Sequence, residues 1–154
     1  MAMQTPLRRQ LARLPLVAAV LILSACAGMQ EAQEPTRPAH GYATLQGSDA
    51  VAELAGGATW AAGKGMTYLS VSPDGGLVLA TASAENRVYA YRTESGELLA
   101  KIDVGESPKG VKIDPEGEYA LVANEEPGSV SVIDLTRLAV VKEIAVGPTP
   151  HNSV

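Results

Sequence analysis

Few residues of this sequence have the types and spacing that chemistry requires. The chain has two histidines and one cysteine among its 154 residues, and it contains neither Cys-x-x-Cys-His nor His-Glu-x-x-His. The first motif attaches c-type haem and the second binds catalytic zinc, so both chemistries are excluded within these residues. The side chains that remain to be considered are His151, Cys26 and a few carboxylates.

The carboxylates lie beside turn sequences. Asp74, Asp114 and Glu116 flank Pro and Gly, where a short acidic side chain accepts hydrogen bonds from nearby backbone amides. Acid–base catalysis would need a paired pKa environment, which the sequence does not display. Glu125-Glu126 is an isolated acidic pair of the kind that is usually solvated. No catalytic residue and no metal site are therefore predicted.

Cys26 follows a segment with the layout of an export signal. Three arginines (Arg8, Arg9 and Arg13) precede an apolar run over residues 14–23, which is too short to span a membrane permanently. The sequence Leu-Ser-Ala-Cys at residues 23–26 resembles the lipobox of bacterial lipoproteins. That resemblance implies a signal peptide over residues 1–25 and lipidation of Cys26. Because Ala27 follows the cysteine, it also implies an outer-membrane anchor facing the periplasm or the cell surface.

The segment after the cysteine is expected to be a flexible tether. Residues 26–41 are polar and contain Pro35 and Pro38, with no strand-like or helix-like periodicity. Beyond the signal segment the chain carries nine Lys and Arg against 17 Asp and Glu. This acidic balance argues against nucleic acid as a partner.

The rest of the sequence repeats itself. Residues 68–110 align without a gap on residues 110–152 at an offset of 42 residues, so that Pro73 matches Pro115 and Ile102 matches Ile144. A period of this length with strand-like alternation is typical of β-propeller blades. The expected strands of the two copies are residues 68–72, 77–82, 87–92 and 97–104, then 111–114, 119–124, 129–134 and 139–146.

A shorter copy precedes these two blades. Residues 42–67 are predicted to supply the last three strands of a blade, with residues 42–46 matching 119–123, residues 50–54 matching 130–134 and residues 59–63 matching 101–105. Residues 153–154 fall at the start of a further blade. The fold class is therefore all-β, with about two and a half four-stranded blades, and we expect the chain to be the amino-terminal piece of a longer propeller.

The repeat resembles a known family. Residues 119–124 (Tyr-Ala-Leu-Val-Ala-Asn) and 129–134 (Ser-Val-Ser-Val-Ile-Asp) are similar to the YVTN-type β-propeller repeat, and Val146-Gly147 followed by Pro150-His151 is similar to its inter-blade segment. That repeat is related to the propellers of surface-layer proteins, of haem d1 nitrite reductase and of quinoprotein amine dehydrogenases. The resemblance is specific for the fold and not for one activity, because propellers carry many functions.

His151 is the candidate ligand contact. The equivalent positions in the two preceding copies are Thr67 and Lys109, so the repeat itself does not require imidazole. The resemblance to haem d1 propellers, in which a histidine ligates iron, implies haem d1 as an alternative to no cofactor. The expected function is a lipid-anchored envelope propeller that binds a protein, glycan or small ligand without chemistry of its own. The alternative is a redox-linked propeller, handling haem d1 or resembling a quinoprotein dehydrogenase.

Overall fold

A computed structural model describes residues 40–152 of the chain, and the proposed signal peptide, Cys26 and nearly all of the tether lie outside these residues. Eleven strands and no helix are found in this part of the chain. The strands are β1 (Tyr42–Leu45), β2 (Ala50–Glu53), β3 (Thr59–Ala61), β4 (Met66–Val71), β5 (Leu77–Ala82), β6 (Arg87–Arg92), β7 (Leu98–Asp103), β8 (Glu106–Ile113), β9 (Tyr119–Glu126), β10 (Ser129–Asp134) and β11 (Ala139–Ala145). Within residues 40–152, no helical segment has the length and apolar character needed to cross a bilayer.

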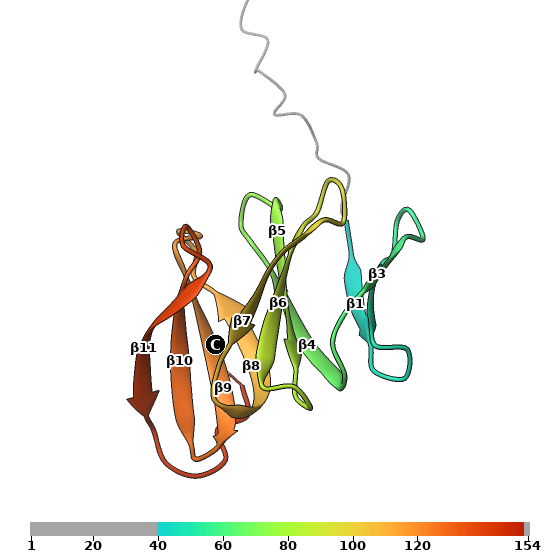
Figure 1. Cartoon of the computed structure of the whole chain (residues 1–154). Coiled ribbons are helices and arrows are strands. Elements are labelled where there is room, and N and C mark those ends of the chain that lie inside the picture. Colours follow the sequence, from blue (N-terminus) through green and yellow to red (C-terminus); the bar gives the residue numbers. More distant parts are fainter. Residues whose placement is uncertain (1–39, 153–154) are drawn as a thin grey trace, which may run out of the picture. The chain divides into compact units, whose positions relative to one another are not determined.

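The strands form three antiparallel sheets in chain order (Figure 1). Strands β4 to β7 make one four-stranded sheet and β8 to β11 make the next, with each strand hydrogen-bonded to its neighbour in sequence. Strand β4 packs against β8, and β1 packs against β4, so successive sheets are joined along their first strands. This arrangement confirms the predicted all-β class and the partial β-propeller.

Several predicted strands match the structure closely. Strands β5, β6 and β10 have the predicted bounds, whereas β4 begins two residues earlier than predicted and β8 begins at Glu106 rather than residue 111. The early part of β8 was missed because Pro108 and Gly110 interrupt the apolar pattern. A bulge between Pro108 and Val111 accommodates them in the ladder with β9.

The first sheet has three strands, in the order β1-β2-β3, as predicted for the last three strands of a blade. Its register corrects the predicted alignment. Val51 pairs with Trp60, as Val88 pairs with Ile102 and Val130 with Ile144. Val51, rather than the predicted Ala50, is therefore the structural equivalent of Val130.

The 42-residue repeat is also a repeat of backbone conformation. Gly65 directly before β4, Ser107 at the start of β8 and Thr149 after β11 are 42 residues apart and have positive φ angles of 71°, 53° and 53°. The connection that follows the last strand of each sheet is fixed by one recurring hydrogen bond, from Ala62, Val104 or Val146 N–H to the carbonyl of Asp49, Asn86 or Gly128 (2.9, 3.0 and 2.9 Å). The backbone frame is thus the same in three consecutive connections, although the side chains differ.

Two apolar cores lie between the sheets, and we call them the first and second junctions. The first junction, between β1–β3 and β4–β7, has as its largest members Val51, Trp60, Met66, Tyr89 and Tyr91. The second junction, between β4–β7 and β8–β11, is aliphatic and contains Leu79, Val88, Ala90, Ile102, Val111, Ile113, Ala120, Val122 and Ile133.

The sheet of β8–β11 has one apolar face that nothing within residues 40–152 covers. Leu79 and Ile102 are 0% and 4% exposed in the second junction, whereas their repeat equivalents Leu121 and Ile144 are 38% and 39% exposed. Tyr119, Leu121 and Val132 line a mainly apolar hollow of about 470 Å³ on that face. The same sequence positions are therefore buried in one sheet and exposed in the next.

Candidate functional site

The candidate site is at the end of the sheets where the innermost strands begin. Lys109 lies in β8, Glu125 lies near the end of β9, and His151 follows β11. The predicted blade positions place Thr67, Lys109 and His151 at equivalent points 42 residues apart, and Ser83 and Glu125 are a second equivalent pair. The repeat therefore brings a short row of side chains from successive sheets to one end.

Glu125 is the centre of this cluster. Its Oε2 lies 3.4 Å from Lys109 Nζ and accepts a hydrogen bond from Ser107 Oγ at 3.2 Å, while its Oε1 lies 3.6 Å from His151 Nδ1. The Glu125 side chain is 28% exposed and that of Lys109 is 22% exposed. One half-buried carboxylate thus orients an ammonium group, a hydroxyl and an imidazole. We call Ser107, Lys109, Glu125 and His151 the charged cluster.

The position of His151 is fixed by the backbone and by a neighbouring ring. Gly110 N–H donates to the His151 carbonyl at 3.0 Å, and the Tyr68 ring meets the imidazole edge-on with centroids 6.3 Å apart. A Cβ atom on Gly110 would lie 2.9 Å from the Asn152 Cα, so only glycine allows this close approach. Because Nδ1 faces Glu125, the Nε2 atom is the one left to meet a ligand.

At the equivalent place in the β4–β7 sheet, two hydroxyl groups stand where the β8–β11 sheet has the charged cluster. The Thr67 and Ser83 hydroxyls are within hydrogen-bond distance of each other, and Ser83 Oγ donates to the Pro108 carbonyl at 2.8 Å. These neutral groups satisfy one another and connect adjacent sheets. The charged cluster supplies both donors and acceptors at the equivalent place, which suits it to hydrogen-bond a polar ligand.

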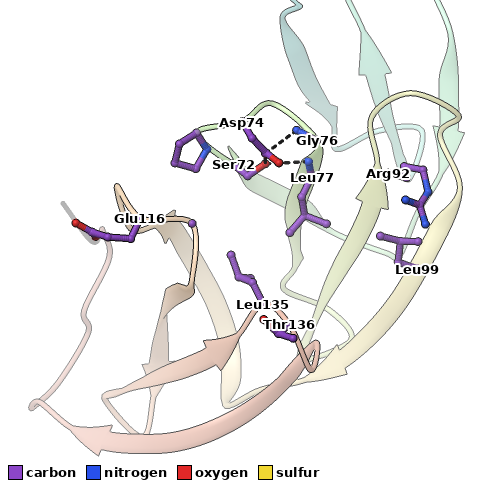
Figure 2. A pocket seen from close by; sticks show the side chains of 11 residues that line it. Ser72, Asp74, Gly76, Leu77, Arg92, Leu99, Glu116, Leu135 and Thr136 are labelled. Carbon is purple, nitrogen blue, oxygen red and sulfur yellow. Dashed lines mark hydrogen bonds between the residues drawn. The ribbon is translucent and has the colours of Figure 1, made fainter.

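A separate groove lies at the opposite end of β4–β7, between the two complete sheets (Figure 2). It has a volume of about 530 Å³, which is within the range of small-molecule sites. Leu77, Leu99 and Leu135 provide its apolar lining, and Arg92 and Glu116 lie at different sides of it (Figure 2). Arg92 Nε already donates to Glu97 Oε2 at 3.2 Å. The groove is a cavity without a convergent set of reactive groups.

Comparison with known proteins identifies the family. The family model described as "Lactonase, 7-bladed beta-propeller" matches residues 36–152, about three quarters of the chain. The chain belongs to this lactonase family of seven-bladed β-propellers. A search of curated proteins found no match.

Solved structures show the same fold at low sequence identity. Hydrazine synthase of Kuenenia stuttgartiensis has a TM-score of 0.68 at 22% identity, with 72% of this chain and 34% of that chain covered. The dihydro-heme d1 dehydrogenase NirN has a TM-score of 0.63 at 20% identity, with 73% and 27% covered. A protein of unknown function from Desulfotomaculum acetoxidans DSM 771 has a TM-score of 0.58 at 18% identity, with 67% and 36% covered.

These likenesses confirm the propeller fold. This lactonase-family chain spans about a third of the length of these structures. At this level of sequence identity, structural similarity establishes only the architecture. The activity has to be argued from the residues of the candidate site.

Two of the three carboxylates predicted to serve turns, Asp74 and Asp114, accept hydrogen bonds there. Asp74 Oδ1 accepts hydrogen bonds from Ser72 Oγ and from Gly76 N–H, as the dashed lines in Figure 2 show. Asp114 Oδ1 accepts from Glu118 N–H at 2.8 Å. Glu116 is exposed beside the groove. The described residues contain no group of three His, Cys, Asp or Glu side chains placed to hold a metal ion.

Sequence reasoning singled out His151 but missed its partners. Glu125 was interpreted as a solvated loop residue, yet it lies in β9 and contacts Lys109 and His151. The available signal was the repeat offset, which assigns Lys109 and His151 to equivalent positions in successive innermost strands. The contact with Glu125 also depends on how adjacent sheets pack, and a single sequence does not contain that information.

Proposed function

We propose that this lactonase-family chain is part of a lipid-anchored envelope propeller that binds a polar small molecule or glycan without transforming it. The supporting observation is the charged cluster, which replaces the self-satisfied hydroxyl pair found at the equivalent place in the β4–β7 sheet. A carboxylate, an ammonium and an imidazole together donate to and accept from ligand hydroxyl groups.

The binding proposal is tested with the chain carrying Lys109→Ala or Glu125→Ala. Binding to a panel of soluble envelope glycans is measured by calorimetry, with Arg87→Ala as the control because Arg87 pairs with Asp103 outside the cluster. We expect both cluster variants to lose binding that the control keeps. Equal binding by all four proteins would contradict the proposal.

The anchor is proposed from the sequence around Cys26. Several acyl chains, each stabilised by about 0.8 kcal/mol per buried methylene, would hold the protein firmly on a bilayer. Labelled palmitate should enter the wild-type protein in bacterial cells, and Cys26→Ser should prevent labelling and release the protein from washed membranes. A Cys26→Ser protein that stays with the membranes would overturn the anchor.

Lactone hydrolysis is the second candidate, because the family description names it and because His151 Nδ1 faces a carboxylate. A histidine oriented in this way can take a proton from water. Release of acid from simple lactones, lost in His151→Ala, would favour this function over binding alone.

The redox-linked alternative concerns haem d1 or a quinone cofactor. One of the solved relatives is a dihydro-heme d1 dehydrogenase, and His151 Nε2 is a possible iron ligand in this chain. A Soret band in protein purified from its native host, absent in His151→Ala, would support this alternative. Purified protein without visible absorption would leave the binding proposal in place.

A further inference from the structure

The groove between the two complete sheets (Figure 2) lies where the first junction is packed. Leu135 and Thr136, which line the groove, belong to the turn between β10 and β11. At an offset of 42 residues, the equivalent turn joins β6 to β7 and contains Gly96. That turn lies directly on the Trp60 ring, because a Cβ atom on Gly96 would overlap the indole. The repeat therefore allows this place to be filled, and the second junction leaves it hollow.

The middle of the groove is apolar. Leu77, Leu99 and Leu135 line it, and all three are half-buried side chains that also pack against the second core. Their remaining surface faces a space of about 530 Å³. A ligand that covers them removes apolar surface from water on both partners, which favours binding. The leucines therefore suit a ligand with apolar side chains.

Charges of opposite sign lie on the two sides of these leucines. Arg92 lies beside Leu99 on one side, and Glu116 lies on the other side, beyond Leu135 (Figure 2). The Glu97 carboxylate accepts from Arg92 Nε, so the N–H groups on the two Nη atoms are left to donate to a ligand. Glu116 is exposed, and within residues 40–152 its side chain has no ion pair or hydrogen bond.

We propose that the groove binds a short apolar peptide with free ends. The terminal carboxylate accepts hydrogen bonds from the Arg92 Nη atoms, which is a charge-assisted pairing. The terminal ammonium lies at the Glu116 carboxylate, and the apolar side chains cover the three leucines. The Thr136 hydroxyl, which also lines the groove, pairs with a peptide group between the two ends.

The balance of charge favours a zwitterion over a simple fatty acid. The carboxylates of Asp74 and Glu116 line the groove and Glu97 lies beside it, whereas Arg92 is the one cation among the lining residues. A ligand that carries only a negative charge gains Arg92 but is repelled by these carboxylates. A peptide with free ends uses charges of both signs. The groove is at the opposite end of the β4–β7 sheet from the charged cluster, so either binding proposal can fail without the other.

Calorimetry with the full chain tests the assignment, and the probe is the tripeptide Leu-Leu-Leu. We expect the free tripeptide to bind. Its affinity should fall about three- to fivefold when the carboxylate is amidated or the amine is acetylated, because each end makes a partly exposed charge pair. Decanoate is the comparison ligand, and tighter binding of decanoate than of the tripeptide would contradict a peptide site.

Variants matched to the blocked peptides separate charge pairing from packing. Arg92→Gln should weaken the free tripeptide about three- to fivefold and leave the affinity for the amidated tripeptide unchanged. Glu116→Gln should behave in the same way when the acetylated tripeptide replaces the amidated one. Arg87→Gln is the control, because Arg87 pairs with Asp103 away from the groove.

The proposal has clear points of failure. Circular dichroism first checks that each variant keeps its strands. The proposal is overturned if the free tripeptide does not bind, or if the free and the doubly blocked tripeptides bind equally well. It is also overturned if Arg92→Gln weakens the free and the amidated tripeptides by the same factor, because the loss would then come from altered packing.

Discussion

The two junctions between sheets share one backbone frame and differ in almost every side chain. The first has aromatic rings in its core, whereas the buried residues of the second core are aliphatic. The sheets differ at one end too, because the β4–β7 sheet has the Thr67 and Ser83 hydroxyls where the β8–β11 sheet has the charged cluster. The recurring hydrogen bonds from Ala62, Val104 and Val146 show why this is possible. These backbone bonds lie within each sheet and fix where its last strand ends, so the side chains between sheets can differ without changing where the connection to the next sheet begins.

The largest effect is expected from emptying the first junction. Trp60→Ala should lower the free energy of unfolding by about 3–5 kcal/mol, because it removes the ring that joins Tyr42 to Tyr91 and leaves a cavity. Urea denaturation followed by circular dichroism measures the change. Ile102→Ala, at the equivalent position in the second junction, should cost about 2–5 kcal/mol. A Trp60→Ala protein as stable as the parent would show that the Trp60 ring contributes no packing to the first junction.

A smaller effect is expected at the start of β8, where the Asn86 side chain accepts a hydrogen bond from the backbone. Asn86 Oδ1 accepts from Ser107 N–H at 3.0 Å, and Asn86→Ala should cost about 1 kcal/mol by removing this bond. The matched control is Ser95→Ala, whose longer bond to Glu97 N–H lies in an exposed turn. Equal losses in the two variants, measured by thermal unfolding, would contradict a special role for the connection.

The junctions should also respond differently to alkaline pH. Burial and the bond to Glu85 raise the pKa of Tyr89 to about 12, above the value of about 10 for a tyrosine in an unfolded chain. The unfolded state therefore loses this proton first. Stability from Tyr89 is fully present below about pH 10 and falls as the pH rises to about 12. Unfolding curves over this range should show a weaker pH dependence in Tyr89→Phe, and an unchanged dependence would refute this assignment.

The smallest effect on stability is expected at the charged cluster. Glu125→Gln should change the free energy of unfolding by only about 0–1 kcal/mol, because its partners are partly exposed and screened by solvent. The same variant should still lose ligand, which calorimetry measures. A large loss of stability would mean that the cluster is part of the framework of the second junction rather than a binding site.

The 42-residue repeat was enough to predict most strands of the two complete sheets. The register of the shorter first sheet and the contacts made by His151 could not be predicted from it. Alternation in residues 129–134 and the flanking turns were enough to place β10. The predicted alignment of the first sheet was wrong by one residue at Val51, because that copy is shorter than the other two and its register is fixed only by pairing with Trp60. The partners of His151 were missed for a related reason, since Glu125 reaches it only through the packing of adjacent sheets.

The recurring left-handed backbone conformation at Gly65, Ser107 and Thr149 affects how such a protein can evolve. Each of these residues precedes, by two places, one of the side chains Thr67, Lys109 and His151. After tandem duplication of a blade, the turn can be inherited intact while the neighbouring side chain mutates without refolding the chain. New specificity can then arise one blade at a time, and an engineer could graft recognition groups onto the same three places.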